Sequence, residues 1–261
     1  MEINFYKYQG TGNDFIMIDN RTSVYDKIKD TDLIRLLCDR RFGIGADGLI
    51  SLENSERSDF TMIYYNADGH LSSMCGNGGR CIVAFASYLG IIENKAEFLA
   101  PDGLHDATID NGIVSLRMSD VYEMEIDAND YILDTGSPHF IRFVEDINRV
   151  RVVEAGRQIR YNERFNENGI NVNFVEKQDD IIQVATYERG VEDETYSCGT
   201  GVTAAAIAYV HKYSPDYGEK LIQVKTKGGD LKISLVFTDR GFTDIHLIGP
   251  AEKVFEGEIS L

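Results

Sequence analysis

The stretch Met74-Cys-Gly-Asn-Gly-Gly-Arg-Cys81 runs directly into the apolar segment Ile82-Val-Ala-Phe-Ala. A similar stretch, Ser197-Cys-Gly-Thr-Gly-Val-Thr-Ala204, lies in the second half of the chain and is also followed by apolar residues. Both segments are apolar on nearly every side, which is typical of a buried helix rather than a surface helix. The sequence therefore predicts two buried helices, one starting just after Cys75 and one just after Cys198.

Other short motifs recur in the same order around these two stretches. The offset between the two cysteines is 123 residues (198 − 75), and the offset between Gly12 and Gly136 is 124 (136 − 12). Further pairs at the same spacing are Arg41 with Arg164, Gly45 with Gly169, and Asp47 with Asn171. Repeats at a fixed distance indicate repeated structure. We therefore expect two structurally equivalent halves.

Each half shows the same order of predicted elements. The first reads as strands at 5–8 and 15–19, a helix at 31–41, strands at 48–52 and 60–65, and the buried helix. The second reads as a strand at 140–144, a helix at 152–161, strands at 172–176 and 181–187, and the buried helix. Turn pairs that end or join strands follow each buried helix: Asp102-Gly103, Asn111-Gly112, Gly228-Gly229 and Arg240-Gly241.

This pattern predicts an α+β protein with two pseudo-symmetric domains. Each domain is expected to be a curved, mostly antiparallel sheet or barrel around a central helix. We assign residues 1–119, with Cys75, to the first half and residues 120–249, with Cys198, to the second. The polar, acidic stretch 119–130 marks the boundary. The active site is expected in the cleft where the two halves face each other.

Composition excludes several classes of function. The 261 residues include 43 acidic and 26 basic side chains, which gives a net charge of −17. Binding to nucleic acid or to an anionic membrane depends on Lys and Arg, so we expect neither partner. No apolar stretch approaches the roughly 18 residues of a membrane span, and the N-terminus does not read as a signal peptide. We therefore expect a cytoplasmic protein.

The cysteine spacing argues against disulfides and zinc. The chain has four cysteines and no C-x-x-C pair, and a reducing cytoplasm disfavours structural disulfides. Cys38 and Cys81 lie inside helical patterns and are expected to be core residues. We therefore expect no metal site, and we infer that Cys75 and Cys198 carry the chemistry.

A thiol at a helix N-terminus has two consequences. The partial positive charge there favours the thiolate, and the unpaired N–H groups can hold a carboxylate that the glycines allow to come close. If two such thiols faced each other, one could remove the α-proton of a bound amino acid while the other supplied a proton to the opposite face. This would invert the stereocentre without an organic cofactor. Two alternatives are a pair of tight strand-to-helix turns and a redox dithiol protein.

The motifs resemble those of the diaminopimelate epimerase family. The resemblance rests on Gly10-Thr-Gly-Asn-Asp-Phe15, Arg41-Phe-Gly-Ile-Gly-Ala-Asp-Gly48, Asn66-Ala-Asp-Gly69, Met74–Cys81, Gly136-Ser-Pro-His139, Glu188-Arg-Gly190 and Glu194–Gly201. It implies a homodimeric enzyme that interconverts LL- and meso-diaminopimelate without pyridoxal phosphate, in lysine biosynthesis. It also implies that the last strand, within residues 250–261, can return to the first domain. A proline or hydroxyproline racemase of the same fold is the nearer alternative.

The resemblance also implies a role for each matching residue. Cys75 and Cys198 would be the paired acid and base, with Glu188 and His139 beside the thiols and the reacting amine. The residues expected to present N–H groups to the α-carboxylate are Gly76, Asn77, Gly199 and Thr200. The residues expected to hold the rest of the substrate are Asn13, Asn66, Asn171 and Arg189, with Arg189 paired to the distal carboxylate.

Several positions depart from the family pattern. Ser137 replaces an asparagine of the usual Gly-Asn-Pro-His, and Gly48 stands where some members have glutamine. One extra residue lies near Glu192, and His70 replaces a serine. These changes leave the two thiols untouched and affect the distal contacts to the substrate. Asp47 is interpreted as a turn residue.

Overall fold

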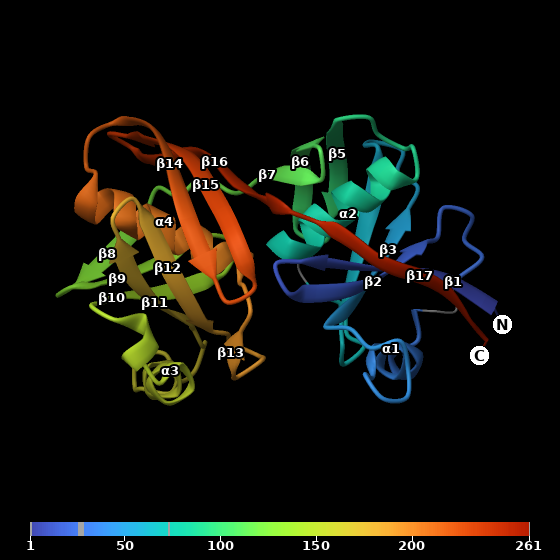
Figure 1. The fold of residues 1–261 in the computed structure, drawn as a ribbon, viewed down its shortest axis with the longest axis horizontal. Helices are drawn as coiled ribbons and strands as arrows, with labels where there is room; N and C mark the ends of the chain where they lie inside the picture. Colours follow the sequence, from blue (N-terminus) through green and yellow to red (C-terminus); the bar gives the residue numbers. More distant parts are fainter. Residues whose placement is uncertain (1, 26–28, 73, 261) are drawn as a thin grey trace. The chain divides into compact units, whose positions relative to one another are not determined.

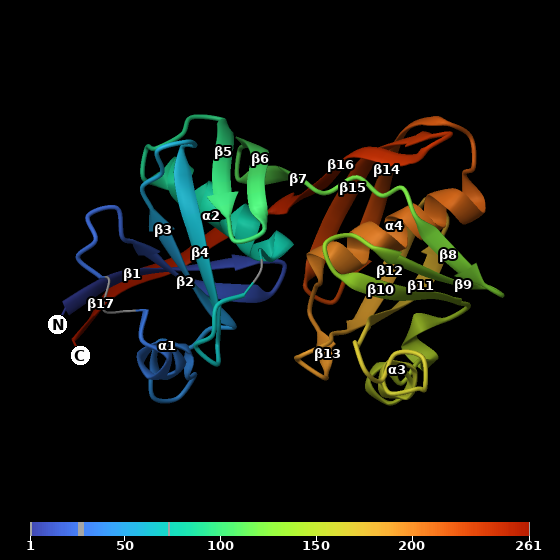
Figure 2. The same ribbon diagram turned by 180° about the vertical axis from the view of Figure 1, so that it is seen from behind.

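A computed structural model describes residues 2–25, 29–72 and 74–260. The chain divides into two compact units (Figures 1 and 2). The first is formed by residues 1–116 together with 249–261, and the second by residues 117–248. No helix within the described residues is long and apolar enough to cross a membrane.

The first unit is built on a mixed sheet. Its strands are neighbours in the order β17, β1, β2, β3, β4, β5, β6 and β7. Their bounds are β1 Glu2–Gly10, β2 Asn13–Asp19, β3 Gly48–Glu53, β4 Phe60–Asn66, β5 Lys95–Ala100, β6 Gly103–Asp110, β7 Ile113–Arg117 and β17 Glu252–Ser260. The pairs β2–β3 and β4–β5 are parallel, and the other pairs are antiparallel.

The second unit has the same kind of sheet, and Figure 2 shows β8 to β11 side by side. Its strand order is β8, β9, β10, β11, β12, β14, β15 and β16, with the short β13 also paired to β12. Their bounds are β8 Met124–Asp127, β9 Asp130–Asp134, β10 Pro138–Val144, β11 Asn171–Gln178, β12 Ile181–Tyr187, β13 Glu194–Thr195, β14 Gly218–Thr226, β15 Gly229–Thr238 and β16 Gly241–Pro250. Here the parallel pairs are β10–β11 and β12–β14.

The two units repeat one topology. The parallel pair β2–β3 corresponds to β10–β11, and β4–β5 corresponds to β12–β14. The antiparallel hairpins that follow each central helix turn at the four predicted turn pairs. The predicted α+β fold with two similar halves is therefore confirmed.

A long central helix packs against the sheet in each unit, as expected (Figure 1). In the first unit, α2 (Gly76–Tyr88) contacts β1, β2, β3, β6 and β17, and its residues from Gly76 to Ala86 are buried. In the second, α4 (Gly199–Tyr213) contacts β9, β10, β11, β12, β14 and β15. Each helix starts directly after its cysteine, so the predicted helix starts are confirmed.

The smaller helices lie outside these central ones. They are α1 (Thr31–Cys38), the 3-10 helix η2 (Ile147–Arg149) and α3 (Val152–Arg160). The helix α1 ends before the predicted residue 41 because Asp39 adopts an extended conformation. The Asp39 carboxylate then accepts hydrogen bonds from the N–H groups of Arg41 and Phe42, which stabilise the turn after the helix. The stretch 119–130, expected at the boundary, contains strand β8.

Candidate functional site

In the first unit, Cys75 occupies the N-cap position of α2. Its backbone is extended, with φ −105° and ψ 130°. The Cys75 carbonyl accepts the first bond of the helix from the Gly79 N–H, at 2.7 Å. The N–H groups of Gly76 and Asn77 lie before that bond, at the positive end of the helix. This end of α2 can therefore hold an anion beside the thiol.

The side chain of Asn13, at the start of β2, lies against Cys75. The thiol donates to Asn13 Oδ1 at 3.6 Å, and Asn77 Nδ2 donates to the same oxygen at 3.2 Å. On its other side, Asn13 Nδ2 donates to Asp47 Oδ2 at 2.8 Å. The carboxylate of Asp47 therefore fixes which end of the Asn13 amide faces the thiol. Asp47, which we interpreted as a turn residue, has this positioning contact as well.

A charged cluster supports Asp47 from behind. Arg40 binds Asp47 Oδ1 and Asp14 Oδ1, both at 2.7 Å, and the buried Lys7 binds Asp14 Oδ2 at 2.7 Å. Burial alone would raise the pKa of Asp14, but the hydrogen bonds from Arg40 and Lys7 outweigh it and hold that pKa well below its usual range. The cluster keeps Asp14 ionised and fixes the loop that carries Asp47.

A buried positive charge lies in the second turn of α2, five residues after Cys75. The Arg80 guanidinium is fully buried, and it donates to Thr11 Oγ1 at 3.1 Å, Pro250 O at 3.4 Å and Gly76 O at 3.5 Å. Burial lowers the pKa of Arg80. Among the described residues its hydrogen-bond partners are neutral oxygens, so its charge adds to the positive end of α2. Sequence reasoning missed this role, although an arginine inside an apolar helix was a visible signal.

In the second unit, Cys198 occupies the N-cap position of α4. Its backbone is again extended, and its carbonyl accepts from the Val202 N–H at 2.9 Å. The Cys198 Sγ lies 3.5 Å from the hydroxyl oxygen of Thr200. The same hydroxyl oxygen lies 2.9 Å from His139 Nε2. The structure thus brings together three of the predicted site residues of this unit.

His139 is completely buried in β10 and its other ring nitrogen also has a partner. Asn173 Nδ2, on β11, lies 3.0 Å from His139 Nδ1. Burial, and then the nearby charge of Arg189, lower the pKa of His139 to about 3. The imidazole is therefore neutral at physiological pH and cannot serve as an acid there. Asn173 was not among the predicted site residues, although it is a polar residue in an otherwise apolar strand.

A second cluster in this unit gathers the residues expected at the distal end of a substrate. Asn171 Oδ1 accepts from the Arg189 N–H at 2.9 Å, and Asn171 Nδ2 donates to Ser137 Oγ at 2.9 Å. The Arg189 guanidinium donates to Asn168 O at 3.0 Å and to Ser137 Oγ at 3.4 Å. Ser137, the departure from the family pattern, accepts from both and so helps to orient Arg189.

Glu192, in the segment that has the extra residue, fastens the loop that carries Glu188 and Arg189. The Glu192 carboxylate accepts from the hydroxyls of Tyr187 at 2.8 Å and Tyr161 at 2.9 Å, and from the Gly190 N–H at 3.1 Å. The Glu192 N–H donates to Glu188 O at 2.8 Å. The Glu192 side chain therefore connects this loop to Tyr161 and Tyr187 in the same unit.

The remaining predicted positions have plainer surroundings. The hydrogen bonds that the structure gives for Asn66, at the end of β4, are made by its backbone, with His70 O and the Gly69 N–H. At Gly48 a Cβ atom would lie 2.6 Å from the Tyr64 ring and 2.6 Å from Tyr65 O, so a glutamine would not fit. Cys38 and Cys81 are buried, and burial raises the pKa of each thiol to about 12. Both therefore remain neutral thiols in the core.

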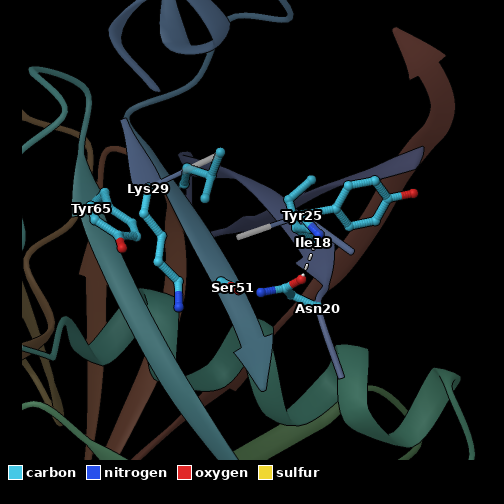
Figure 3. A pocket seen from close by; sticks show the side chains of 7 residues that line it. Ile18, Asn20, Tyr25, Lys29, Ser51 and Tyr65 are labelled. Atoms are coloured by element: carbon cyan, nitrogen blue, oxygen red, sulfur yellow. Dashed lines mark hydrogen bonds between the residues drawn. The ribbon is translucent and has the colours of Figure 1, made fainter. Parts of the chain in front are cut away.

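A pocket in the first unit is too small to hold a substrate. It is lined by Ile18, Asn20, Tyr25, Lys29, Leu49, Ser51 and Tyr65, and it has about 10 Å³ of accessible space (Figure 3). That space is at the limit for a single water molecule. Across the described part of the chain, no three His, Cys, Asp or Glu side chains gather as metal ligands would.

The sequence pattern of the diaminopimelate epimerase family matches residues 5–120 and 131–254. The chain belongs to the diaminopimelate epimerase family. The diaminopimelate epimerase of Flavobacterium psychrophilum is 52% identical over 98% of this chain and 100% of its own. That of Chlorobaculum tepidum is 41% identical over 97% of this chain and 99% of its own.

Solved structures of more distant proteins share the fold. A phenazine biosynthesis protein of the PhzF family from Bacillus anthracis aligns over 100% of both chains with a TM-score of 0.80 and 13% identity. A hydroxyproline epimerase from Agrobacterium vitis aligns over 99% of this chain and 91% of its own, with a TM-score of 0.70 and 15% identity. At these identities the likeness concerns the fold alone, which this family therefore has in common with them.

Proposed function

We propose that this chain interconverts LL- and meso-diaminopimelate by proton transfer at one α-carbon, as an isomerase of lysine biosynthesis. The observation that supports this function best is the repeated arrangement at the two cysteines. Cys75 and Cys198 each occupy the N-cap of a buried helix, with a polar side chain in hydrogen-bond contact with the sulfur. Membership of the family supplies the substrate.

The reaction begins with the α-carboxylate at the helix ends. The N–H groups expected to bind it belong to Gly76, Asn77, Gly199 and Thr200, the first residues of α2 and α4. Each helix end carries about half a positive charge. This charge stabilises the negative charge that spreads into the carboxylate as the α-proton leaves, in the manner of an oxyanion hole.

The proton transfer then requires one thiolate and one thiol at opposite faces of the α-carbon. The thiolate takes the α-proton, and the electron pair of the broken C–H bond stays on the substrate as a carbanion. The other thiol gives its proton to the opposite face and becomes the thiolate. Cys75 and Cys198 exchange these roles in the reverse direction, so the step needs no cofactor to balance.

The remaining site residues hold and orient the substrate in this proposal. Arg189 pairs with the distal carboxylate, which suits its planar guanidinium. Asn13, Asn66 and Asn171 hold the rest of the substrate. Glu188 and His139 lie beside the thiols and the reacting amine, and because His139 is neutral, it acts through hydrogen bonding rather than proton exchange.

Proton NMR of the reduced enzyme with LL-diaminopimelate in D₂O tests the proposal. We expect the α-proton signal to disappear as the meso form accumulates. Cys75→Ala and Cys198→Ala should each abolish epimerisation, whereas the matched control Cys38→Ala, which removes a buried core thiol, should keep most of it. Exchange with proline but not with diaminopimelate would instead assign the chain to a racemase of the same fold.

We also propose that the enzyme works as a homodimer in a reducing cytoplasm. The location is supported by the chemistry, because a disulfide or an oxidised thiol could not carry protons. The dimer is supported by the resemblance to the family. Sedimentation equilibrium tests the dimer, and a mass of about 29.3 kDa in solution would contradict it.

A further inference from the structure

We propose that Asn173 fixes the proton of His139 on Nε2, so that the Thr200 hydroxyl is left to donate its own proton to Cys198 and stabilise the thiolate. Asn173 is then a positioning residue, and the Thr200 side chain gains a role besides that of its backbone N–H. The inference deepens the proposed function, on which its catalytic meaning rests. It depends on the direction of four hydrogen bonds in a row.

The first step is the orientation of the Asn173 amide. Its Nδ2 lies 3.1 Å from the carbonyl oxygen of Phe140, and its Oδ1 lies 2.8 Å from the hydroxyl of Thr186. A carbonyl oxygen can only accept, so the nitrogen end must face Phe140. The flipped amide would place two acceptors against each other. The hydroxyl of Thr186 then donates to Oδ1 and holds this orientation.

The second step follows at the histidine. The other N–H of Asn173 Nδ2 points to His139 Nδ1 at 3.0 Å. Since Asn173 donates there, Nδ1 must accept and cannot carry a proton. A neutral imidazole holds one proton, which therefore lies on Nε2. A doubly protonated imidazole would direct an N–H at the amide N–H, in a site where both side chains are fully buried.

The third step transfers this direction to the thiol. His139 Nε2–H donates to Thr200 Oγ1 at 2.9 Å, and this bond uses one lone pair of the hydroxyl. The hydroxyl proton is then free to point to Cys198 Sγ, which lies 3.5 Å from the same oxygen. A hydrogen bond to a charged group is stronger than one to a neutral group. The hydroxyl therefore favours the thiolate form of Cys198 over the thiol.

Packing leaves this chain of hydrogen bonds little freedom. Thr186 is 3% exposed, and Asn173 and His139 are both 0% exposed. A Cβ atom at Gly201 would lie 2.5 Å from Asn173 Oδ1 and 3.3 Å from His139 Cε1. A side chain at Gly201 would therefore force the Asn173 amide to shift. The positive charge of Arg189 lies near the His139 ring, and it also opposes a second proton on that ring.

The tautomer can be read directly by nitrogen-15 NMR of the imidazole. In the substrate-free enzyme at pH 7 we expect Nε2 protonated and Nδ1 bare, with His139 assigned by the loss of its signals in His139→Gln. In Asn173→Asp a carboxylate replaces the donor, so Nδ1 should gain a proton. A bare Nε2 with a protonated Nδ1 in the unaltered enzyme would overturn the proposal.

The effect on the thiol is measured by alkylation with iodoacetamide, followed by mass spectrometry of the peptide that contains Cys198. At pH 7 Thr200→Val should alkylate about tenfold more slowly, the effect of losing one hydrogen bond to a charged sulfur. Thr200→Ser keeps the hydroxyl and should stay within about threefold of the unaltered enzyme. At a pH that ionises every thiol, the three rates should converge, because the change concerns protonation rather than access.

Equal rates for Thr200→Val and Thr200→Ser at pH 7 would overturn the proposal. So would a slow rate in Thr200→Val that persists at high pH, since that result would show altered access. Both measurements are made without substrate, so they do not depend on the proposed function. If they come out as expected but diaminopimelate is not epimerised, the function fails and the assignment at Cys198 stands.

Discussion

His139 is a histidine that the fold keeps neutral, and this affects stability as well as chemistry. Its pKa is about 3 in the folded chain because of burial and the charge of Arg189, and about 6.5 in the unfolded chain. In that interval the unfolded state binds more protons, so the free energy of unfolding falls as the pH drops. From pH 7 to pH 5 this single residue should remove about 2 kcal/mol of stability.

Urea unfolding at several pH values measures this contribution. The matched variant His139→Gln cannot titrate, so its free energy of unfolding should fall less steeply between pH 7 and pH 5. The variant is expected to be less stable at pH 7, because Asn173 and Thr200 lose a buried partner. Parallel slopes for the two proteins would show that His139 is not buried in its neutral form.

At the residue scale the sequence pointed to the two cysteines more readily than to the side chains packed around them. The two cysteines could be recognised from the constant offset between the repeated motifs and from the glycines that follow each cysteine. Asn173 and Asp47 act through partners 34 residues away, His139 and Asn13 respectively, and no local pattern encodes such a contact. Which end of an amide faces a neighbour depends on three-dimensional packing, which a single sequence does not display.

At the scale of elements, the loop between β12 and β13 carries Arg189, and a substitution in this loop tests what holds Arg189 in place. We expect Glu192→Ala to raise KM for diaminopimelate about five- to tenfold with a smaller change in kcat, because the loop loses the carboxylate that ties it to Tyr161 and Tyr187. It should also cost about 1–2 kcal/mol of stability, since the buried Tyr187 hydroxyl loses its acceptor.

Steady-state kinetics and thermal unfolding of three variants check this expectation. Glu192→Gln keeps an oxygen acceptor and should fall between Glu192→Ala and the unaltered enzyme. The control is Glu163→Ala, which alters an exposed side chain in the turn after α3. It should change neither KM nor stability. An unchanged KM in Glu192→Ala would mean that the loop holds Arg189 in place without this carboxylate.

The sequence was most informative about the positions of helices and hairpin turns. Helix starts and hairpin turns depend on residues close together in the chain, such as Gly76 after Cys75 or the turn pair Gly228-Gly229, so the pattern predicted them. The end of α1 was placed too late because an Asp side chain competes with the helix for backbone N–H groups. Strand β8 was missed because its residues are mostly exposed and show no apolar run.

At the scale of the whole molecule, the two units share a topology but differ at one sheet edge. In the second unit the edge strand beside β9 is β8, which has four residues and directly precedes it in sequence. In the first unit the strand beside β1 is β17, nine residues long and drawn from the far end of the chain. The first unit is therefore complete only when the last residues of the chain have been added.

This difference predicts that the first unit depends on the end of the chain. Strand β17 pairs with β1 along its length, and Phe255 packs its ring against Phe5, with centroids 5.9 Å apart. A chain that stops at Ala251 would leave the hydrogen-bonding edge of β1 and the ring of Phe5 exposed. We expect such a chain to lose the packing of the first unit while the second unit stays folded.

The buried thiols of the first unit report on this directly. Cys38 and Cys81 are 4% and 0% exposed, so pulsed alkylation should label them only when that unit opens. Truncation after Ala251 should raise their labelling at least tenfold, and Phe255→Ala should raise it less. Val254→Ala, which alters an exposed side chain of the same strand, should leave labelling unchanged. If the truncated chain protects both thiols, β1 holds its place without β17, and the long return of the chain serves some purpose other than closing the first sheet.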